Sequence, residues 1–596
     1  MNNSEHGDTR PMLRPFMALS SGFWRGPSAA RAWTLTLLVI GCMLAQIATV
    51  VGVNAWNRVF FDALERRDLG AILATLTWLP LLVGAVAITF SSLIVARMLF
   101  QARWREWMTN TVAGWWIADQ RYYRLGFVAP DQTAPEYRIA DDVRLSIEPL
   151  VEFALGLLTA AITAAAFATI LWQVAGSIRF SMGGRMIEIP AYMAIAAVLY
   201  AIVASLAAYL AGRPFVARIA MKNEAEAQFR AEMTRLRENA ESIALIKGDV
   251  DELSSVRGRY ETVVRAWLGV IRQQGVIAIV QNTNGALFPI IPLLLITPKY
   301  LSGDMTLGAV MQVVAAFSAV QGALIWFVDN LVKLAEWYAS ASRVDELTSA
   351  LEELDVGTIM EDETGISLSV SDDGAIHIEN LSIADRGGRV VINDASVMIR
   401  QGEKVIVTGE SGAGKSMLIR ALAGLWPWGS GAIRMPRDVQ IAFVPQRPYL
   451  PLGTLRDALL YPAGSALAGD EAIVAAMKRC GLSYLIKRLN DDGERWDQTL
   501  SGGERQRVAF CRLLIQKPQI IIMDEATSAL DEESQLSLLS LLLEDLKAAT
   551  VISVAHRPGI EEFHERKIVL EKKQAGAHLT SRRLPKTMWH LLSPPA

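Results

Sequence analysis

The sequence predicts an all-α membrane domain with six spanning helices, followed by an α/β domain that carries a phosphate-binding loop. Three observations support this division. The chain has 596 residues, too many for one compact domain, and 52% of them are hydrophobic with a positive mean hydropathy. Long apolar stretches are confined to the part before residue 335. A strand, a glycine-rich loop and a helical pattern follow one another near residue 409.

Six apolar stretches come close to the roughly 20 residues that a helix needs to cross a bilayer. They cover residues 33–55, 71–96, 150–175, 190–212, 274–297 and 306–328. Amide side chains interrupt them at Gln46, Asn54, Gln173, Gln312 and Gln321. Because amides are costly in lipid, we expect them to face a cavity or a neighbouring helix.

Lysine and arginine orient the spans, because cytoplasmic segments are richer in these residues. The segments after the second and fourth spans carry Arg103, Arg105, Arg121, Arg124, Arg138 and Arg144, and then Arg213, Arg218, Lys222, Arg230, Arg235, Arg237 and Lys247. The opposite segments carry few, apart from the first outer loop with Arg58, Arg66 and Arg67. We therefore expect both termini in the cytoplasm and a first span that is retained rather than cleaved.

Charge and cysteine content argue against two other kinds of protein. The formal net charge of −3 gives no support for nucleic-acid binding. Cys42, Cys480 and Cys511 lie far apart without metal-ligand spacing. We expect no nucleic-acid partner and no disulfide framework.

Composition also sets the domain boundaries. The polar segments after the second and fourth spans favour helix and are expected to extend the spanning helices into the cytoplasm. Residues 334–351 predict another helix. An acidic stretch that contains glycine follows this helix. The predicted parts are an N-terminal cytoplasmic segment (1–32), a membrane domain (33–340), a linker (341–373), an α/β domain (374–575) and a C-terminal tail (576–596).

The α/β part contains a phosphate-binding motif. The apolar strand 405–407 runs into residues 409–416, with a helical pattern behind them. Backbone N–H groups of such a loop surround phosphate oxygens, Lys415 reaches the terminal phosphates of ATP, and Ser416 offers a hydroxyl to Mg²⁺. The expected nucleotide contacts here are Gly409, Glu410, Ser411, Gly412, Ala413, Gly414, Lys415 and Ser416.

A second apolar run, residues 520–523, predicts a buried strand that ends in two carboxylates. Asp524 is placed to hold magnesium, and Glu525 to polarise the attacking water as general base. A carboxylate pair at a strand end can also cap a helix in an unrelated protein. Together with the phosphate loop, the pair forms the acidic half of an ATPase.

Residues 500–504, Leu-Ser-Gly-Gly-Glu, followed by Arg-Gln-Arg and a helical pattern, resemble the signature of ATP-binding cassette (ABC) proteins. The order of Gln446, residues 528–531 and His556 resembles the same family. The resemblance covers essentially the whole chain. It implies a half-transporter in which an exporter-type six-helix membrane domain is fused to a cytoplasmic P-loop ATPase domain, with ATP and Mg²⁺ as cofactors.

This resemblance implies further roles. Gln446 would link magnesium and the attacking water to the membrane domain, and His556 would contact the terminal phosphate. The implied catalytic residues are Glu525, His556, Lys415 and Gln446, and the implied magnesium ligands are Ser416, Gln446 and Asp524. Ser501, Gly502 and Gly503 open a helix, whose free N–H groups form an anion site. In the family this site faces another cassette, which implies a second identical or related chain.

Several stretches are similar to two narrower groups, the BacA/SbmA-like bacterial transporters with fused ATPase and the peroxisomal fatty-acyl (subfamily D) half-transporters. They are residues 54–62, 104–109, 122–124, 237–243, 424–427 and 445–448, together with Trp496. The first resemblance implies a bacterial inner (plasma) membrane. The sequence departs from the family at residues 134–137, ahead of Asp142, and at Ala384 and Asp385, where many cassettes place a ring against adenine.

The cargo depends on a polar cluster in the fifth span, Gln281, Asn282, Thr283 and Asn284. Such residues either line a water-filled cavity or only join helices. A cavity favours a hydrophilic cargo, such as peptides or cobalamin-like compounds, and the alternative is a fatty-acyl or lipid cargo. A membrane-anchored regulatory ATPase is a further alternative, although six spans exceed what anchoring needs. The spans argue against a soluble cassette protein of the translation type.

Overall fold

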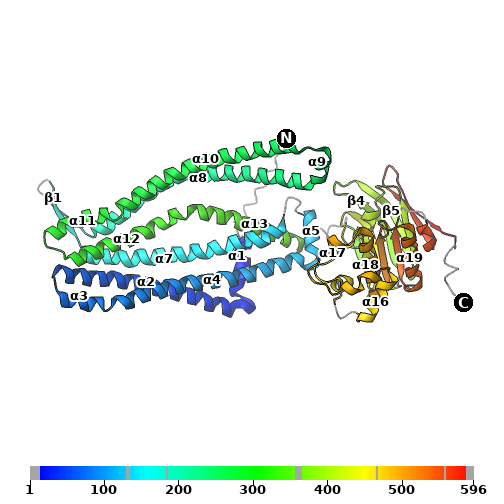
Figure 1. The fold of residues 1–596 in the computed structure, drawn as a ribbon, viewed down its shortest axis with the longest axis horizontal. Coiled ribbons are helices and arrows are strands. Elements are labelled where there is room, and N and C mark those ends of the chain that lie inside the picture. Colours follow the sequence, from blue (N-terminus) through cyan, green and yellow to red (C-terminus); the bar gives the residue numbers. More distant parts are fainter. Residues whose placement is uncertain are drawn as a thin grey trace. The chain divides into compact units, whose positions relative to one another are not determined.

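The computed structural model describes residues 14–128, 134–182, 185–355, 365–464, 468–555 and 559–585. The chain divides between Glu352 and Glu353 into two compact units, each treated separately below. Where it is described, the first unit is mainly helical and contains one hairpin, and the second unit combines two sheets with helices (Figure 1). The predicted fold class is confirmed.

Among its described residues, the first unit contains six helical segments that are long and apolar enough to cross a membrane. The main helices are α2 (Ala29–Glu65), α4 (Leu79–Ile117), α7 (Val143–Ala175), α8 (Tyr192–Glu238), α10 (Asp249–Leu287), α12 (Leu307–Asp329) and α13 (Leu331–Asp355). Shorter helical elements are α1 (Arg14–Ser21), η1 (Gly22–Trp24), η2 (Gly26–Ser28), α3 (Leu69–Leu76), η3 (Ala118–Gln120), α5 (Arg121–Val128), α6 (Pro135–Tyr137), η4 (Arg138–Asp142), α9 (Ala240–Ile246) and α11 (Ile290–Leu301). The hairpin consists of β1 (Ile178–Met182) and β2 (Arg185–Ile189).

Helices α8 and α10 run side by side over much of their length (Figure 1). Their polar parts are continuous with their apolar parts, as the sequence predicted for these segments. Arg235 of α8 pairs with Glu252 of α10 at 2.9 Å. Pro289 separates α10 from α11, because proline has no N–H to continue the hydrogen-bond ladder. The fifth apolar stretch therefore contains a break in its helix.

A buried ion pair joins the start of α7 to α13. Asp142 has no exposed side-chain surface and accepts two hydrogen bonds from Arg343, at 2.9 Å from Nε and 2.6 Å from Nη2. The Arg343 side chain keeps 41% of its surface exposed. A buried carboxylate needs this partner because its charge is costly away from water. The pair lies directly after the segment in which the sequence departs from the family pattern.

We expect Arg343→Met to destabilise the first unit by about 3 kcal/mol, because it leaves the buried Asp142 carboxylate without its cation. Thermal unfolding in detergent measures the loss as a lower midpoint temperature. Asp142→Asn added to Arg343→Met should recover part of it. The control is Arg235→Met: its guanidinium is more than half exposed and pairs with Glu232 and Glu252, and its loss should cost less than about 1 kcal/mol. Equal losses for both arginine variants would contradict a special role for burial.

The second unit is built on a six-stranded sheet of order β12-β11-β6-β10-β9-β8 and a four-stranded sheet of order β3-β7-β4-β5. The strands are β3 (Ser367–Ser371), β4 (Ile376–Ala384), β5 (Val390–Ile399), β6 (Lys404–Gly409), β7 (Gly429–Pro436), β8 (Ile441–Val444), β9 (Ile520–Asp524), β10 (Thr550–Val554), β11 (Arg566–Glu571) and β12 (His578–Arg583). The helical elements are α14 (Lys415–Leu422), α15 (Leu455–Leu460), α16 (Asp470–Arg479), η5 (Ser483–Arg488), α17 (Trp496–Thr499), α18 (Gly502–Gln516), α19 (Glu532–Glu544) and η6 (Ile560–Phe563).

The parallel strands β6, β10 and β9 form the centre of the six-stranded sheet. Their apolar side chains are buried on both faces, as continuous runs of valine and isoleucine predict. One apolar core lies between the four-stranded sheet, α14 and the six-stranded sheet, and another surrounds α18 and α19. In this order the carboxyl ends of β6 and β9 lie at the same edge of the sheet, on either side of β10.

The segment predicted as a linker, residues 341–373, contains the end of a helix and a strand. Helix α13 continues to Asp355, and β3 pairs with β7 in the four-stranded sheet. Strand β3 was missed because its serines alternate with only two apolar residues on an edge that is mostly exposed. The acidic residues 361–363 lie outside the described residues.

Candidate functional site: a phosphate loop, two carboxylates and a separate helix start

The predicted phosphate loop lies between β6 and α14. Gly412 and Gly414 adopt positive φ angles of 78° and 92°, which favour glycine. A Cβ atom at Gly414 would lie 2.8 Å from Val391 and 3.0 Å from Ile392, so a side chain here would force these neighbours to move. The loop therefore leads directly into the N-terminus of α14, where backbone N–H groups favour a phosphate.

Lys415 is held by the loop that it closes. Its ammonium group donates to the carbonyl oxygens of Gly409 at 2.9 Å and Glu410 at 2.8 Å, and only 7% of the residue is exposed. Burial lowers the pKa of Lys415, whereas the charges of Glu525 and Asp524 act in the opposite direction. The cation is thus positioned at the loop that would surround the phosphates.

Asp524 ends β9 and receives a hydrogen bond from Ser416 of α14. Burial raises the pKa of Asp524, while this hydrogen bond lowers it. Hydroxyl and carboxylate oxygens are ligands that Mg²⁺ prefers. The donor set at this point fits a magnesium ion.

Glu525 directly follows β9 in a conformation that few residues other than glycine adopt, with φ at 48°. Its N–H group donates to the carbonyl oxygen of Val554 at 3.0 Å, which anchors this turn to β10. Its carboxylate accepts a hydrogen bond from Nε2 of Gln446 at 2.9 Å. Backbone strain of this kind is typical of functional positions, where the surroundings over-determine the geometry.

Gln506 was not singled out from the sequence, yet it joins three motifs. Its side chain is 1% exposed and donates to the carbonyl oxygen of Gln446 at 3.2 Å. It also accepts from the N–H group of Ala529 at 3.0 Å and lies 3.4 Å from the Ser528 hydroxyl. A buried amide with several partners fixes the backbone around it. Gln506 therefore ties the start of α18 to Gln446 and to the segment after Glu525.

A capping box fixes the start of α18, where the sequence predicted an anion site. Ser501 accepts a hydrogen bond from the Glu504 N–H group at 3.3 Å, and Glu504 accepts from the Ser501 N–H group at 2.7 Å. The Ser501 hydroxyl also donates to Glu504 at 2.6 Å, and the Tyr484 hydroxyl donates to the same carboxylate. The hydrogen bonds from Ser501 and Tyr484 lower the pKa of Glu504. Burial and the neighbouring Glu504 raise the pKa of Tyr484 to about 12.

A cavity of about 510 Å³ opens at this helix start. It is lined by Gly481, Tyr484, Ser501, Gly502, Gly503, Glu504, Arg507, Ala529, Leu530 and Asp531. No residue of the phosphate loop is among them. Among the described residues, the structure brings together the phosphate loop, Gln446, Asp524 and Glu525, and it places residues 501–503 at a separate cavity.

Two points of the predicted nucleotide site remain: the position of His556 and the missing aromatic ring near Ala384. His556 lies outside the described residues, which end at Ala555 and resume at Gly559. Where an adenine-stacking ring was missing, Trp428 accepts a hydrogen bond from the Ala384 N–H group at 3.1 Å. The Arg386 guanidinium lies 5.7 Å from the centre of the Trp428 ring. The guanidinium of Arg386 and the ring of Trp428 thus lie close to Ala384, where the sequence has no aromatic residue to stack on adenine.

Two family models match the chain. Residues 26–301 match the ABC transporter transmembrane region 2 family, and residues 392–528 match the ABC transporter family. The matched ranges contain most of the first unit and, in the second, the phosphate loop, Gln446, residues 501–503 and both carboxylates. Both halves of the chain therefore have relatives of the same class.

Whole-length relatives carry the same combination. An ABC transporter ATP-binding protein of Synechocystis is 31% identical over 89% of this chain and 79% of its own length. The inner membrane ABC transporter ATP-binding protein YddA of Escherichia coli is 28% identical over 92% and 96%. The human lysosomal cobalamin transporter ABCD4 is 26% identical over 90% and 91%. A bacterial Atm1-family ABC exporter with ATP bound has a similar fold, with a TM-score of 0.66 at 19% identity over 92% of this chain and 95% of that chain.

Proposed function

We propose that two identical copies of this chain bind ATP between them and move a hydrophilic solute. The premise is the family: the chain belongs to the ATP-binding cassette (ABC) transporters and is a half-transporter. The family hydrolyses ATP to drive transport across a membrane. One observation carries the dimeric arrangement: the cavity at Ser501 is lined without any residue of the chain's own phosphate loop. A nucleotide that contacts both elements needs a second cassette.

Each residue of the nucleotide site has a separate role in ATP binding and hydrolysis. The phosphate loop and Lys415 bind the phosphates, and Glu525 accepts the proton of the attacking water. Gln446 orients Glu525 through the 2.9 Å hydrogen bond between their side chains. Ser416, Asp524 and Gln446 would hold Mg²⁺, which supplies positive charge against the phosphates. We also propose that His556 contacts the terminal phosphate, as the family resemblance implies, and that adenine stacks against Arg386.

Polar groups inside the first unit support a hydrophilic cargo. A cavity of about 470 Å³ is lined by residues of α2, α4, α7 and α12, among them Gln46, Arg97 and Glu152, and by Asn330 just after α12. Arg97 and Glu152 approach to 3.6 Å, and among the described residues the side-chain oxygen of Gln46 has no hydrogen-bond partner. Polar side chains on spanning helices mark solute pathways because they are costly against lipid. Peptides or cobalamin-like compounds fit this chemistry better than a fatty-acyl chain.

The resemblance and the basic segments also support a location. We propose a bacterial inner membrane with both termini in the cytoplasm, as the basic segments after the second and fourth spans predict. The Escherichia coli relative is itself named an inner membrane protein. Cysteine accessibility at the ends of α2 in intact cells and in inverted vesicles tests this orientation.

The transport function is tested with the purified protein in sealed vesicles. We expect one particle of two identical chains, and ATP-dependent movement of a hydrophilic solute that stops when ATP is replaced by a non-hydrolysable analogue. A panel of peptides, cobalamin and fatty-acyl compounds identifies the cargo class. A fully active monomer would contradict the shared nucleotide site, and ATP hydrolysis without movement of any solute would favour a regulatory ATPase.

Two residues of the polar cluster in the fifth span, Asn282 and Asn284, have different surroundings, and we expect their substitutions to have different effects. Asn284 accepts a hydrogen bond from the Tyr200 hydroxyl at 2.7 Å, so Asn284→Leu should lower thermal stability. Asn282 is exposed within the single chain, and we expect Asn282→Leu to reduce transport while ATP hydrolysis persists. Transport assays and unfolding curves of both variants check this. Unchanged transport of every cargo by Asn282→Leu would remove Asn282 from the solute path.

A further inference from the structure

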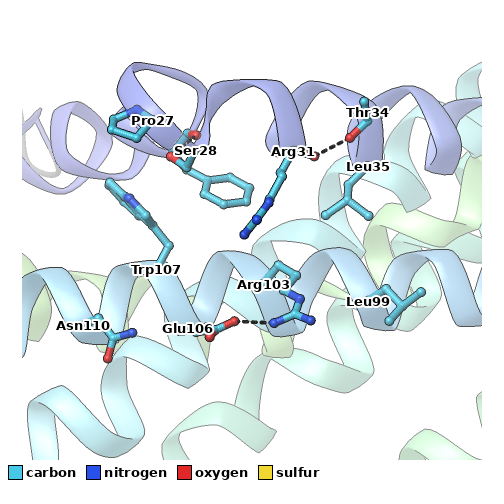
Figure 2. A pocket seen from close by; sticks show the side chains of 11 residues that line it. Pro27, Ser28, Arg31, Thr34, Leu35, Leu99, Arg103, Glu106, Trp107 and Asn110 are labelled. Carbon is cyan, nitrogen blue, oxygen red and sulfur yellow. Dashed lines mark hydrogen bonds and ion pairs between the residues drawn. The ribbon is translucent and has the colours of Figure 1, made fainter.

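A cavity between the N-terminal segment, α2 and α4 plays no part in the nucleotide chemistry. It has a volume of about 620 Å³ and is lined by residues of η1, η2, the first turns of α2 and the second half of α4. Figure 2 shows Arg31 reaching from α2 toward the side of α4 that carries Arg103. Two guanidinium groups from different helices therefore line one space.

The charges in this cavity are not balanced within the described part of the chain. Arg103 pairs with Glu106 at 2.8 Å, while both side chains stay more than half exposed. Arg31 is exposed and, among the described residues, has no carboxylate within ion-pair distance. Glu106 is the single carboxylate among the residues that line the cavity, against two arginines. The cavity thus has a surplus of positive charge.

The rest of the lining is arranged for an amphipathic ligand. Leu35 and Leu99 lie on one side of the arginines, and Trp107 lies on the other (Figure 2). Leu99 is 48% exposed and Val95, one turn earlier on α4, is 56% exposed. An uncovered apolar strip therefore continues from the cavity along the spanning part of α4. Tryptophan is typical of the level at which lipid headgroups lie.

We propose that this cavity binds an anionic phospholipid, with its phosphate between Arg31 and Arg103 and its acyl chains along Leu35 and Leu99. Basic pockets between spanning helices are suited to anionic headgroups. Arginine fits a phosphate because its planar group offers paired donors. This site is distinct from the proposed solute cavity, and it requires only that the chain is embedded in a membrane.

The test compares how phosphatidylglycerol and phosphatidylcholine bind to the delipidated, purified protein. Native mass spectrometry measures the amount of each lipid bound. We expect the wild-type protein to prefer phosphatidylglycerol. Each of Arg31→Gln and Arg103→Gln should weaken that binding about fivefold, and the double variant about thirtyfold. The matched control is Arg25→Gln, which removes an exposed arginine next to the cavity but outside its lining and should bind as the wild type does.

Two further measurements guard against misfolding and against a different anion. Glu106→Gln removes the carboxylate beside Arg103 and should strengthen phosphatidylglycerol binding about fivefold, which a folding defect does not produce. Glycerol 3-phosphate should fail to displace the lipid at the same concentration. The proposal is overturned if phosphatidylcholine binds equally well, if the double variant binds as the wild type does, or if glycerol 3-phosphate displaces the lipid.

Discussion

Glu525→Gln should bind ATP, close the dimer and then stall, with turnover at least about 100-fold below the wild type. General-base catalysis is typically worth about 10²- to 10⁴-fold, and an amide does not accept the proton of the attacking water. Glutamine keeps an oxygen that can accept the hydrogen bond from Gln446, so the local geometry survives. The measurements are phosphate release and the amount of ATP retained after rapid removal of free nucleotide.

The matched control for this variant is Glu533→Gln, the same substitution at an exposed position in the first turn of α19. It should hydrolyse ATP at the wild-type rate. Hydrolysis by Glu525→Gln at a rate near that of the wild type would mean that another group accepts the proton.

Lys415→Ala should fail one step earlier, at nucleotide binding. The substitution removes a buried cation from the loop, together with the hydrogen bonds that close the loop on Gly409 and Glu410. Loss of one member of a buried charge pair typically costs about 2–5 kcal/mol, which is at least about thirtyfold in affinity. Equilibrium binding of a fluorescent ATP analogue measures the change, and no ATP should be trapped.

Lys478→Ala, on an exposed face of α16, provides the control for Lys415→Ala and should bind ATP normally. The pair Lys415→Ala and Glu525→Gln separates binding from hydrolysis, because only the second should retain ATP. Retention of ATP by Lys415→Ala at the level of Glu525→Gln would contradict the role assigned to the lysine.

The sequence predicted those parts of the molecule whose physical cause is local. A spanning helix needs an apolar run of sufficient length, and a phosphate loop needs glycines between a strand and a helix. Both properties are present in consecutive residues, so the six spans and the loop before Lys415 could be located. The hairpin of β1 and β2 was not predicted, although the alternating residues on either side of Gly183 and Gly184 favour one.

Contacts between distant residues could not be predicted in this way. Asp142 and Arg343 are 201 positions apart, and neither has a pattern that indicates the other. Gln506 looks like one more polar residue of an amphipathic helix until its three partners are known. Such pairs depend on which helices and loops pack together, which composition and spacing do not determine.

The capping box at the start of α18 has a consequence for ligand selection. Glu504 already occupies the N–H and hydroxyl groups of Ser501, and because it is three residues away it competes at a high effective concentration. A free phosphate ion from solution has to displace this tethered carboxylate and gains little by doing so. A nucleotide fixed on another protein surface arrives with its phosphates already immobilised and loses less entropy when it replaces Glu504. In the proposed dimer, Glu504 would therefore compete with dissolved anions for the N–H and hydroxyl groups of Ser501, and would yield to a phosphate that the second cassette presents.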